Sequence, residues 1–353
     1  MRDDDGVWAA AVSEVAAEVD RAEVDRADVA LDAPLDGGPR LATRSWSDLL
    51  GAALGAVGQA AGDVLIDVVR DAIGPDSMDR VDDVLAFARQ RLTGDYVVDE
   101  FGFDQQFADI IAANVLRPLY TSWFRVDVRG VENLPVAGGG LVVANHSGTF
   151  PLDALMTQQA VLHEHPGGRQ LRLLGADLVF AVPIVAEIAR ASGATLACAE
   201  DSARLLEQGE LVGVFPEGFK GSGKLYKDRY KLQRFGRGGF VSAAVRTHVP
   251  LVPCSIVGAE ETYPMLANAG TLARLLGLPY VPLTPTFPWL GPLGLVPLPS
   301  KWIIQFGEPI PTDGFDVALA DDPAFVFDLT DQVRETIQQT LNRLLPERGP
   351  TFG

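Results

Sequence analysis

Cysteine is scarce in this chain of 353 residues, which contains only 2. Cys198 and Cys254 cannot build the multi-bridge framework of a small secreted scaffold, so the chain fits a reducing compartment such as the cytoplasm. Basic residues are also few, since 29 Lys and Arg stand against 47 Asp and Glu, giving a net charge of −18. That balance argues against a nucleic-acid partner, whose binding needs a positive surface.

Metal-site and hydrolase patterns are missing as well. The chain has 4 histidines and neither a His-x-x-x-His pair nor a Cys-x-x-Cys pair, so no metal site is predicted. No G-x-S-x-G elbow of a serine hydrolase occurs. Residues 218–225 approach the nucleotide-binding P-loop, but Leu225 stands where a hydroxyl would hold Mg²⁺, so we read this match as chance.

The longest uncharged run of the chain is residues 275–300, which hold 26 residues without a charge and seven prolines. Each interior proline removes a helix donor at a cost of about 3 kcal/mol, which makes a spanning helix implausible. We call this segment the apolar lobe, and two interpretations of it are open. It is either a proline-rich cover over the core or a surface that meets lipid or lines an acyl pocket.

The N-terminal part differs in composition from the rest. Residues 1–36 carry a net charge of −8, and we expect a mobile arm over 1–40. Residues 1–30 lack a basic start followed by an apolar stretch, so no secretory signal is expected. A helical region should follow over 41–118. Its apolar periodicity predicts helices at 45–73, 78–92 and 107–123.

Residues 119–347 alternate between short apolar runs and helical patterns. Strands are expected at 124–128, 141–145, 171–174, 194–198, 211–215, 249–257 and 302–306. Helices are expected at 151–164, 183–191, 201–208 and 239–247, and a last one, capped by Asp322 with Pro323 at its first position, should run to about Leu345. Such alternation predicts an α/β fold, a layered sheet flanked by helices.

One histidine, His146, stands at a strand end, where open α/β sheets place their ligands. Asp153 follows seven residues later, too far along a continuous helix for a hydrogen bond. Gly148 and Pro151 predict a turn before the helix instead, which can return the carboxylate to the imidazole. An aspartate on one ring nitrogen fixes the tautomer and leaves the other nitrogen to take a proton from a hydroxyl. A capping aspartate beside a structural histidine is the alternative.

A second cluster follows another strand, at Phe215, Pro216, Glu217 and Gly218. Residues 219–237 then carry seven basic side chains and one acid. A concentrated positive segment in an acidic protein suits a phosphate-bearing ligand, which binds through charge and hydrogen-bond donors together. The basic residues expected to bind substrate are Lys220, Lys224, Lys227 and Arg234.

Together, Asn145-His146 with Asp153, Phe215-Pro-Glu-Gly218 and Val249-Pro-Leu-Val-Pro253 resemble the glycerolipid acyltransferase superfamily, in the same order along the chain. The resemblance implies that His146 is the general base, with Asp153 as its orienting partner. It also implies that Glu217 and Gly218 help hold the acceptor. Other substrate contacts are expected from Asn145, Ser147, Gly148, Thr149, Phe215 and Pro216.

Two departures from the family qualify this resemblance. The usual spacing is His-x-x-x-x-Asp, whereas here six residues intervene. The family also commonly has an arginine near positions 192–193, and the stretch 194–201 that follows offers none. The basic segment is therefore open to another use, binding the 3′-phosphate and pyrophosphate of coenzyme A.

The expected activity is an O-acyl transfer from acyl-CoA, or from an acyl-carrier protein, to a glycerolipid or lysophospholipid hydroxyl. No cofactor is expected, because acyl-CoA is a co-substrate. Backbone N–H groups at the helix start near Pro151 are expected to stabilise the oxyanion. We expect a cytoplasmic protein, peripheral on the inner membrane face and held there by apolar contact rather than charge. A thioester or lipid ester hydrolase and a non-catalytic lipid-binding protein are the alternatives.

Overall fold

The computed structural model describes residues 97–181 and 183–352. The predicted arm over 1–40 and the predicted helices at 45–73 and 78–92 lie outside the described residues, as does most of the helical region expected over 41–118.

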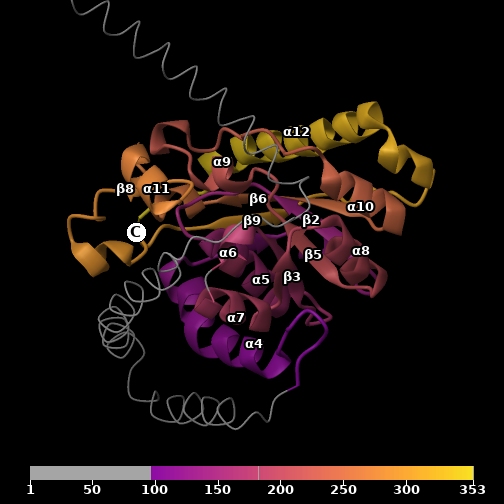
Figure 1. The fold of residues 1–353 in the computed structure, drawn as a ribbon, viewed down its shortest axis with the longest axis horizontal. Coiled ribbons are helices and arrows are strands. Elements are labelled where there is room, and N and C mark those ends of the chain that lie inside the picture. Colours follow the sequence, from indigo (N-terminus) through magenta and orange to yellow (C-terminus); the bar gives the residue numbers. More distant parts are fainter. Residues whose placement is uncertain (1–96, 182, 353) are drawn as a thin grey trace, which may run out of the picture. The chain divides into compact units, whose positions relative to one another are not determined.

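A seven-stranded sheet lies at the centre of the described part of the chain (Figure 1). Its order is β1-β9-β6-β2-β5-β3-β4, and the five strands from β6 to β4 are parallel. β9 runs antiparallel to β6 and parallel to the edge strand β1. The α/β fold with a layered sheet is confirmed. The bounds are β1 Asp127–Arg129, β2 Gly140–Ala144, β3 Leu171–Gly175, β4 Ala194–Leu196, β5 Leu211–Val214, β6 Leu251–Val257 and β9 Ile303–Phe306.

Helices cover both faces of the sheet, because its central strand β2 is apolar on both sides. Leu141 and Val143 pack into one apolar cluster, while Val142 and Ala144 pack into the other, as the alternation of side chains along a strand requires. The first cluster is covered by α8 (Ala199–Glu207), α10 (Gly239–Thr247) and α12 (Pro323–Glu347). The second is covered by α5 (Leu152–Glu164) and the helical segment before β1 (Figure 1).

The helix predicted at 107–123 exists but is irregular. Asp104 caps it by accepting a hydrogen bond from the Phe107 N–H at 2.9 Å. It begins with α4 (Gln105–Ile111) and continues as π-helical turns over Ala112–Leu116 and Leu119–Trp123. Pro118 separates the two turns because it has no N–H to donate.

The last helix starts as predicted. The Asp322 side chain accepts hydrogen bonds from the N–H groups of Ala324 and Phe325, and Pro323 occupies the first turn of α12. The shorter helices are α6 Asp177–Ala181, α7 Pro183–Ala191, α9 Gly218–Ser222 and α11 Gly270–Leu276. Single 3₁₀ turns lie at 131–133, 226–228, 259–261, 291–295 and 317–321.

The apolar lobe adopts irregular structure. It contains the end of α11, a strand β8 (Pro282–Leu283) that pairs with β7 (Ala267–Asn268), and the 3₁₀ turn at 291–295. Within the part of the chain that the structure describes, no helix combines the length and the apolar character that crossing a membrane requires.

Candidate active site

The loop that follows β2 begins with an anchored residue, Asn145. Its side-chain Nδ2 donates to the Ile256 carbonyl at 3.1 Å, and its Oδ1 accepts from the Ile256 N–H at 2.7 Å. The side chain is buried and fully engaged with β6. Asn145, expected to contact substrate, thus fixes the point at which the loop leaves the sheet.

His146 and Asp153 meet in the way the turn predicts. The imidazole Nδ1 lies 2.7 Å from Asp153 Oδ2, and Gly148 makes the turn between them with a φ of 82°. Asp153 Oδ2 also accepts from the Ser147 N–H at 2.8 Å, and Oδ1 accepts from the Ala154 N–H at 2.8 Å. These bonds hold the carboxylate in one orientation and leave Nε2 as the imidazole nitrogen available to a substrate.

The two side chains differ in their access to solvent. Asp153 is 0% exposed, whereas the His146 side chain is 17% exposed, and its ring lies against Phe215 with centroids 5.1 Å apart. No residue of the described chain hydrogen-bonds to His146 Nε2. The arrangement therefore resembles a histidine oriented by a buried carboxylate and open to a ligand on its other side.

Burial and charge act on His146 in opposite directions. Burial by itself lowers the pKa of the imidazole, but the charge of Asp153 and its hydrogen bond raise it, and the net pKa lies above the usual value. The carboxylate therefore stabilises the protonated ring. A base that must take up a proton during a reaction needs that stabilisation.

Glu217 connects two loops of the site. Its Oε1 accepts from the His146 N–H at 2.9 Å and its Oε2 accepts from the Gln233 N–H at 2.7 Å. The Glu217 side chain is 0% exposed. Gly221 permits this close approach, since a Cβ at this position would lie 2.9 Å from the Cβ of His146. Glu217 thus fixes the backbone position of His146.

Lys224 is the one member of the basic segment whose side chain is buried, at 3% exposed. Its Nζ lies 3.4 Å from Glu217 Oε2 and 2.9 Å from Glu260 Oε1. Burial lowers the pKa of this ammonium, but the charges and hydrogen bonds of Glu260 and Glu217 outweigh burial. The net pKa of Lys224 therefore lies above its usual value. Lys224 therefore remains charged and faces two carboxylates of the chain, not the solvent from which an anion would arrive.

The other basic residues of this segment are exposed. Lys231 pairs with Asp228 at 3.1 Å, and Arg229 lies over the ring of Tyr226. Lys220 and Lys227 are exposed too. Ligand binding by Lys220, Lys227 and Arg234 stays a prediction.

Two buried hydroxyls of the loop lack partners. Ser147 Oγ and Thr149 Oγ1 have no hydrogen-bond partner in the described chain. The Thr149 carbonyl accepts from the Tyr280 hydroxyl at 2.9 Å, and that hydroxyl also lies 3.1 Å from Ser222 Oγ. Tyr280 thus joins the apolar lobe to the loop that carries His146.

The helix start offers fewer oxyanion donors than the sequence suggests. The Leu152 N–H donates to the Phe150 carbonyl at 2.7 Å, and the Leu155 N–H donates to the Pro151 carbonyl at 3.2 Å. The Ala154 N–H is bound to Asp153. Three of the N–H groups expected to stabilise an oxyanion are therefore already engaged, because the tight turn closes on itself.

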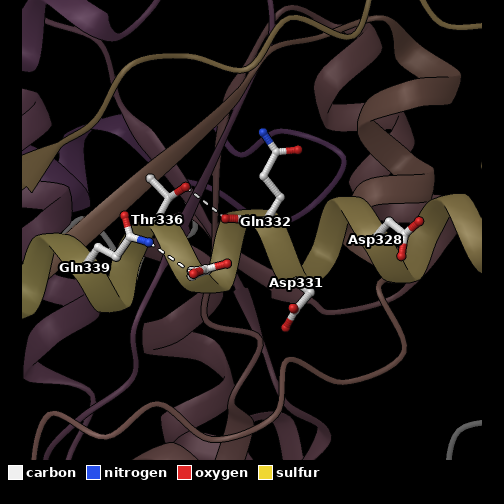
Figure 2. A pocket seen from close by; sticks show the side chains of 6 residues that line it. Asp328, Asp331, Gln332, Thr336 and Gln339 are labelled. Carbon is white, nitrogen blue, oxygen red and sulfur yellow. Dashed lines mark hydrogen bonds between the residues drawn. The ribbon is translucent and has the colours of Figure 1, made fainter.

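Figure 2 shows a hollow of about 280 Å³ elsewhere, lined from α12 by Asp328, Asp331, Gln332, Glu335, Thr336 and Gln339. Its lining includes three acids and no basic residue, so its charge repels an anionic ligand. Among the described residues, no cluster of three or more His, Cys, Asp or Glu could hold a metal ion.

Comparison with known proteins gives three results. The acyltransferase family model matches residues 125–257, a span that contains His146, Asp153 and Glu217. Uncharacterized proteins of Mycobacterium tuberculosis and Mycobacterium leprae are 62% and 61% identical over 269 residues, covering 76% of this chain and 75% and 73% of theirs. The crystal structure of the 1-acyl-sn-glycerophosphate acyltransferase PlsC from Thermotoga maritima matches with a TM-score of 0.44 and 21% identity, covering 67% of this chain and 82% of that one.

Proposed function

Because the acyltransferase family model matches residues 125–257 of the chain, we propose that the protein transfers a fatty acyl group from acyl-CoA to a hydroxyl of a glycerolipid or lysophospholipid. The observation that supports this most is the His146–Asp153 pair at 2.7 Å, whose Nε2 is unengaged within the described chain. An oriented imidazole with one open nitrogen is suited to deprotonate a hydroxyl.

In this mechanism, Nε2 of His146 takes the proton of the acceptor hydroxyl while its oxygen attacks the thioester carbonyl. The tetrahedral intermediate collapses with cleavage of the C–S bond, and the imidazolium returns the proton to the leaving thiolate. Asp153 stabilises the imidazolium between these steps, as the raised pKa of His146 indicates. No acyl-enzyme is formed, because the hydroxyl itself is the nucleophile.

The unpartnered hydroxyls of Ser147 and Thr149, on the loop that carries His146, are the candidates to stabilise the oxyanion, since the helix-start N–H groups are engaged. Exposed Lys220 lies two residues after Gly218 and is suited to a phosphate of the acceptor. Glu217 acts on the acceptor indirectly in this scheme, by holding His146 in place.

A panel of lipid acceptors with labelled acyl-CoA, read by mass spectrometry, tests the proposal. We expect a labelled acyl ester on a glycerolipid or lysophospholipid, formed in step with CoA release. CoA release that does not change when any lipid alcohol is added would identify a thioesterase instead. Vesicle binding without thioester cleavage on any acyl-CoA would identify a lipid-binding protein.

Membrane contact through the apolar lobe is the second part of the proposal. Residues 262–300 contain one charged side chain, Arg274, in a protein of net charge −18. Trp289 is 71% exposed, and other large apolar side chains of this region are exposed as well, at Leu266, Leu272, Leu275, Leu290 and Leu293. A surface of this kind suits the peripheral, inner-face location that the sequence predicts. Since Tyr280 joins the lobe to the His146 loop, contact there would bring a lipid acceptor to the site.

Replacing Trp289, Leu290 and Leu293 together by serine should weaken binding to phosphatidylglycerol–phosphatidylcholine vesicles by about tenfold or more. The reason is that burying each large apolar side chain contributes about 1.5–3 kcal/mol. Vesicle co-sedimentation of the full chain measures the effect.

The matched control replaces three other exposed apolar residues, Val136, Val317 and Phe352, by serine. This variant should bind vesicles as the wild type does. Equal losses in both triple variants would mean that the lobe has no special role, and unchanged binding of the lobe variant would remove it as the contact surface.

A further inference from the structure

A pocket of about 240 Å³ lies between the segment after Gln233 and the first turns of α12. Its walls carry three guanidinium groups, those of Arg234, Arg237 and Arg334, and one carboxylate, that of Asp331. Asp331 Oδ1 accepts hydrogen bonds from Arg334 at 2.8 Å and 3.0 Å. The charge of the lining is therefore positive in a protein that is acidic as a whole.

Arg234 is exposed, and its guanidinium makes no hydrogen bond or ion pair with any residue that the structure describes. Guanidinium groups match the oxygens of phosphates in pairs, with two parallel hydrogen bonds. An arginine at a pocket wall without a protein acceptor is thus suited to an anionic ligand.

Thr330 adds a second, independent feature. It is 9% exposed, lines the same pocket, and its Oγ1 is buried without a hydrogen-bond partner in the described chain. Buried hydroxyls in native proteins nearly always have a partner, so an orphan in a pocket wall indicates that a ligand supplies it. Phe327, one helical turn earlier, lines the pocket as well and exposes its ring.

The pocket is connected to the candidate active site through one residue. The Gln233 N–H donates to Glu217 Oε2 at 2.7 Å, and the other oxygen of that carboxylate holds the His146 N–H. Arg234 follows Gln233 directly. A ligand bound at Arg234 would therefore lie beside the loop that fixes the position of His146.

We propose that this pocket binds a phosphate monoester, with Arg234 and Thr330 as its ligands and Phe327 as a flat apolar wall. The proposal rests on the proposed function, because two phosphate monoesters belong to that reaction: the 3′-phosphate of CoA and the phosphate of an acceptor of the 1-acylglycerol 3-phosphate type. The Phe327 ring favours the CoA end, since an aromatic face suits stacking by a planar base.

Calorimetric titration of the full chain with adenosine 3′,5′-bisphosphate and, separately, with sn-glycerol 3-phosphate tests the pocket without acyl transfer. We expect the adenosine probe to bind and Arg234→Ala to weaken it by about tenfold or more, since a charge-assisted hydrogen bond is lost. Thr330→Val, which keeps the shape but removes the hydroxyl, should weaken it several-fold. Lys231→Ala is the control, because this exposed base of the same segment pairs with Asp228 and does not line the pocket, and it should change binding less than about twofold.

The two possible ligands, the 3′-phosphate of CoA and the phosphate of the acceptor, predict different results. If the glycerol probe binds and loses affinity in Arg234→Ala while the adenosine probe does not, the site serves the acceptor. The absence of binding by both probes, or equal effects of Arg234→Ala and Lys231→Ala, would overturn the pocket. Binding with no acyl transfer in the lipid panel would leave the pocket intact and refute the proposed function instead.

A kinetic comparison adds a second readout. For an acyl-CoA donor, Arg234→Ala should raise KM by about tenfold with little change in kcat, because the contact is remote from the reacting atoms. For an acyl-dephospho-CoA donor, which lacks the 3′-phosphate, the variant and the wild type should have similar KM values. An equal rise for both donors would contradict a contact with that phosphate.

Discussion

Replacing His146 by alanine should lower kcat for acyl transfer by a factor of about 10²–10⁴, the usual contribution of a general base. The physical reason is that the other titratable side chains described beside His146 cannot take its place: Glu217 is buried and bonded to two backbone N–H groups, and Lys224 is a charged ammonium. The measurement is steady-state transfer of labelled acyl groups, with circular dichroism to verify the fold. Undiminished turnover would refute the mechanism.

Asp153→Asn is the companion variant, and its readout is a pH profile. The base is active only when neutral, so kcat/KM should rise with pH through the pKa of His146, which Asp153 holds above the usual value against the effect of burial. Removing the carboxylate charge leaves burial to lower that pKa, and the acid limb should move to lower pH. The plateau should fall too, because an amide no longer fixes which ring nitrogen carries the proton. An acid limb that stays in place would show that Asp153 does not act on the imidazole.

The contact between His146 and Asp153 could be predicted because the information that determines it is local. Gly148 and Pro151 determine the turn, and the turn brings Asp153 back onto His146 within eight residues. The same applies to the start of α12, because the capping residue Asp322 and the first-turn residue Pro323 are adjacent in the sequence. Elements that depend on a few neighbouring residues are those that a sequence describes well.

Strand positions were also predictable, although their ends were less so. The strand expected at 249–257 begins two residues later, at Leu251, after Pro250. The direction of β9 could not be predicted at all. Some 45 residues, 258–302, separate β6 from β9, and a connection that long allows the chain to return either parallel or antiparallel to β6.

The role of Lys224 was not predictable for a related reason. In sequence it is one of seven bases in the segment 219–237, and nothing adjacent distinguishes it from Lys220 or Lys227. Its strongest partner, Glu260, lies 36 residues away after β6 and reaches Lys224 only when the sheet has formed. An excess of acid in the otherwise apolar stretch 251–266 was the available signal, because a buried carboxylate needs a cation.

Lys224→Met should lower the free energy of unfolding by about 3–5 kcal/mol, the usual cost of leaving a buried charge without its partner. Methionine keeps the length and apolar contacts of the side chain, so the loss reports on charge. Glu217 and Glu260 would then face each other with no cation between them. Chemical denaturation of the full chain measures the change. Lys227→Met, at an exposed position, should stay within about 0.5 kcal/mol of the wild type.

The pH dependence of this loss separates a charge effect from a packing effect. Burial already raises the pKa of Glu260, even though Lys224 opposes the shift, and removing Lys224 must raise that pKa further. An acid with a raised pKa in the folded state gains stability as pH falls through that pKa and loses it as pH rises. The deficit of Lys224→Met should therefore be largest above neutral pH and shrink in acid, and adding Glu260→Gln should recover part of it. A deficit of the same size at every pH would mean that Lys224 contributes by packing alone. In that case its charge would not hold Glu217, and Glu217 would not depend on Lys224 to position His146.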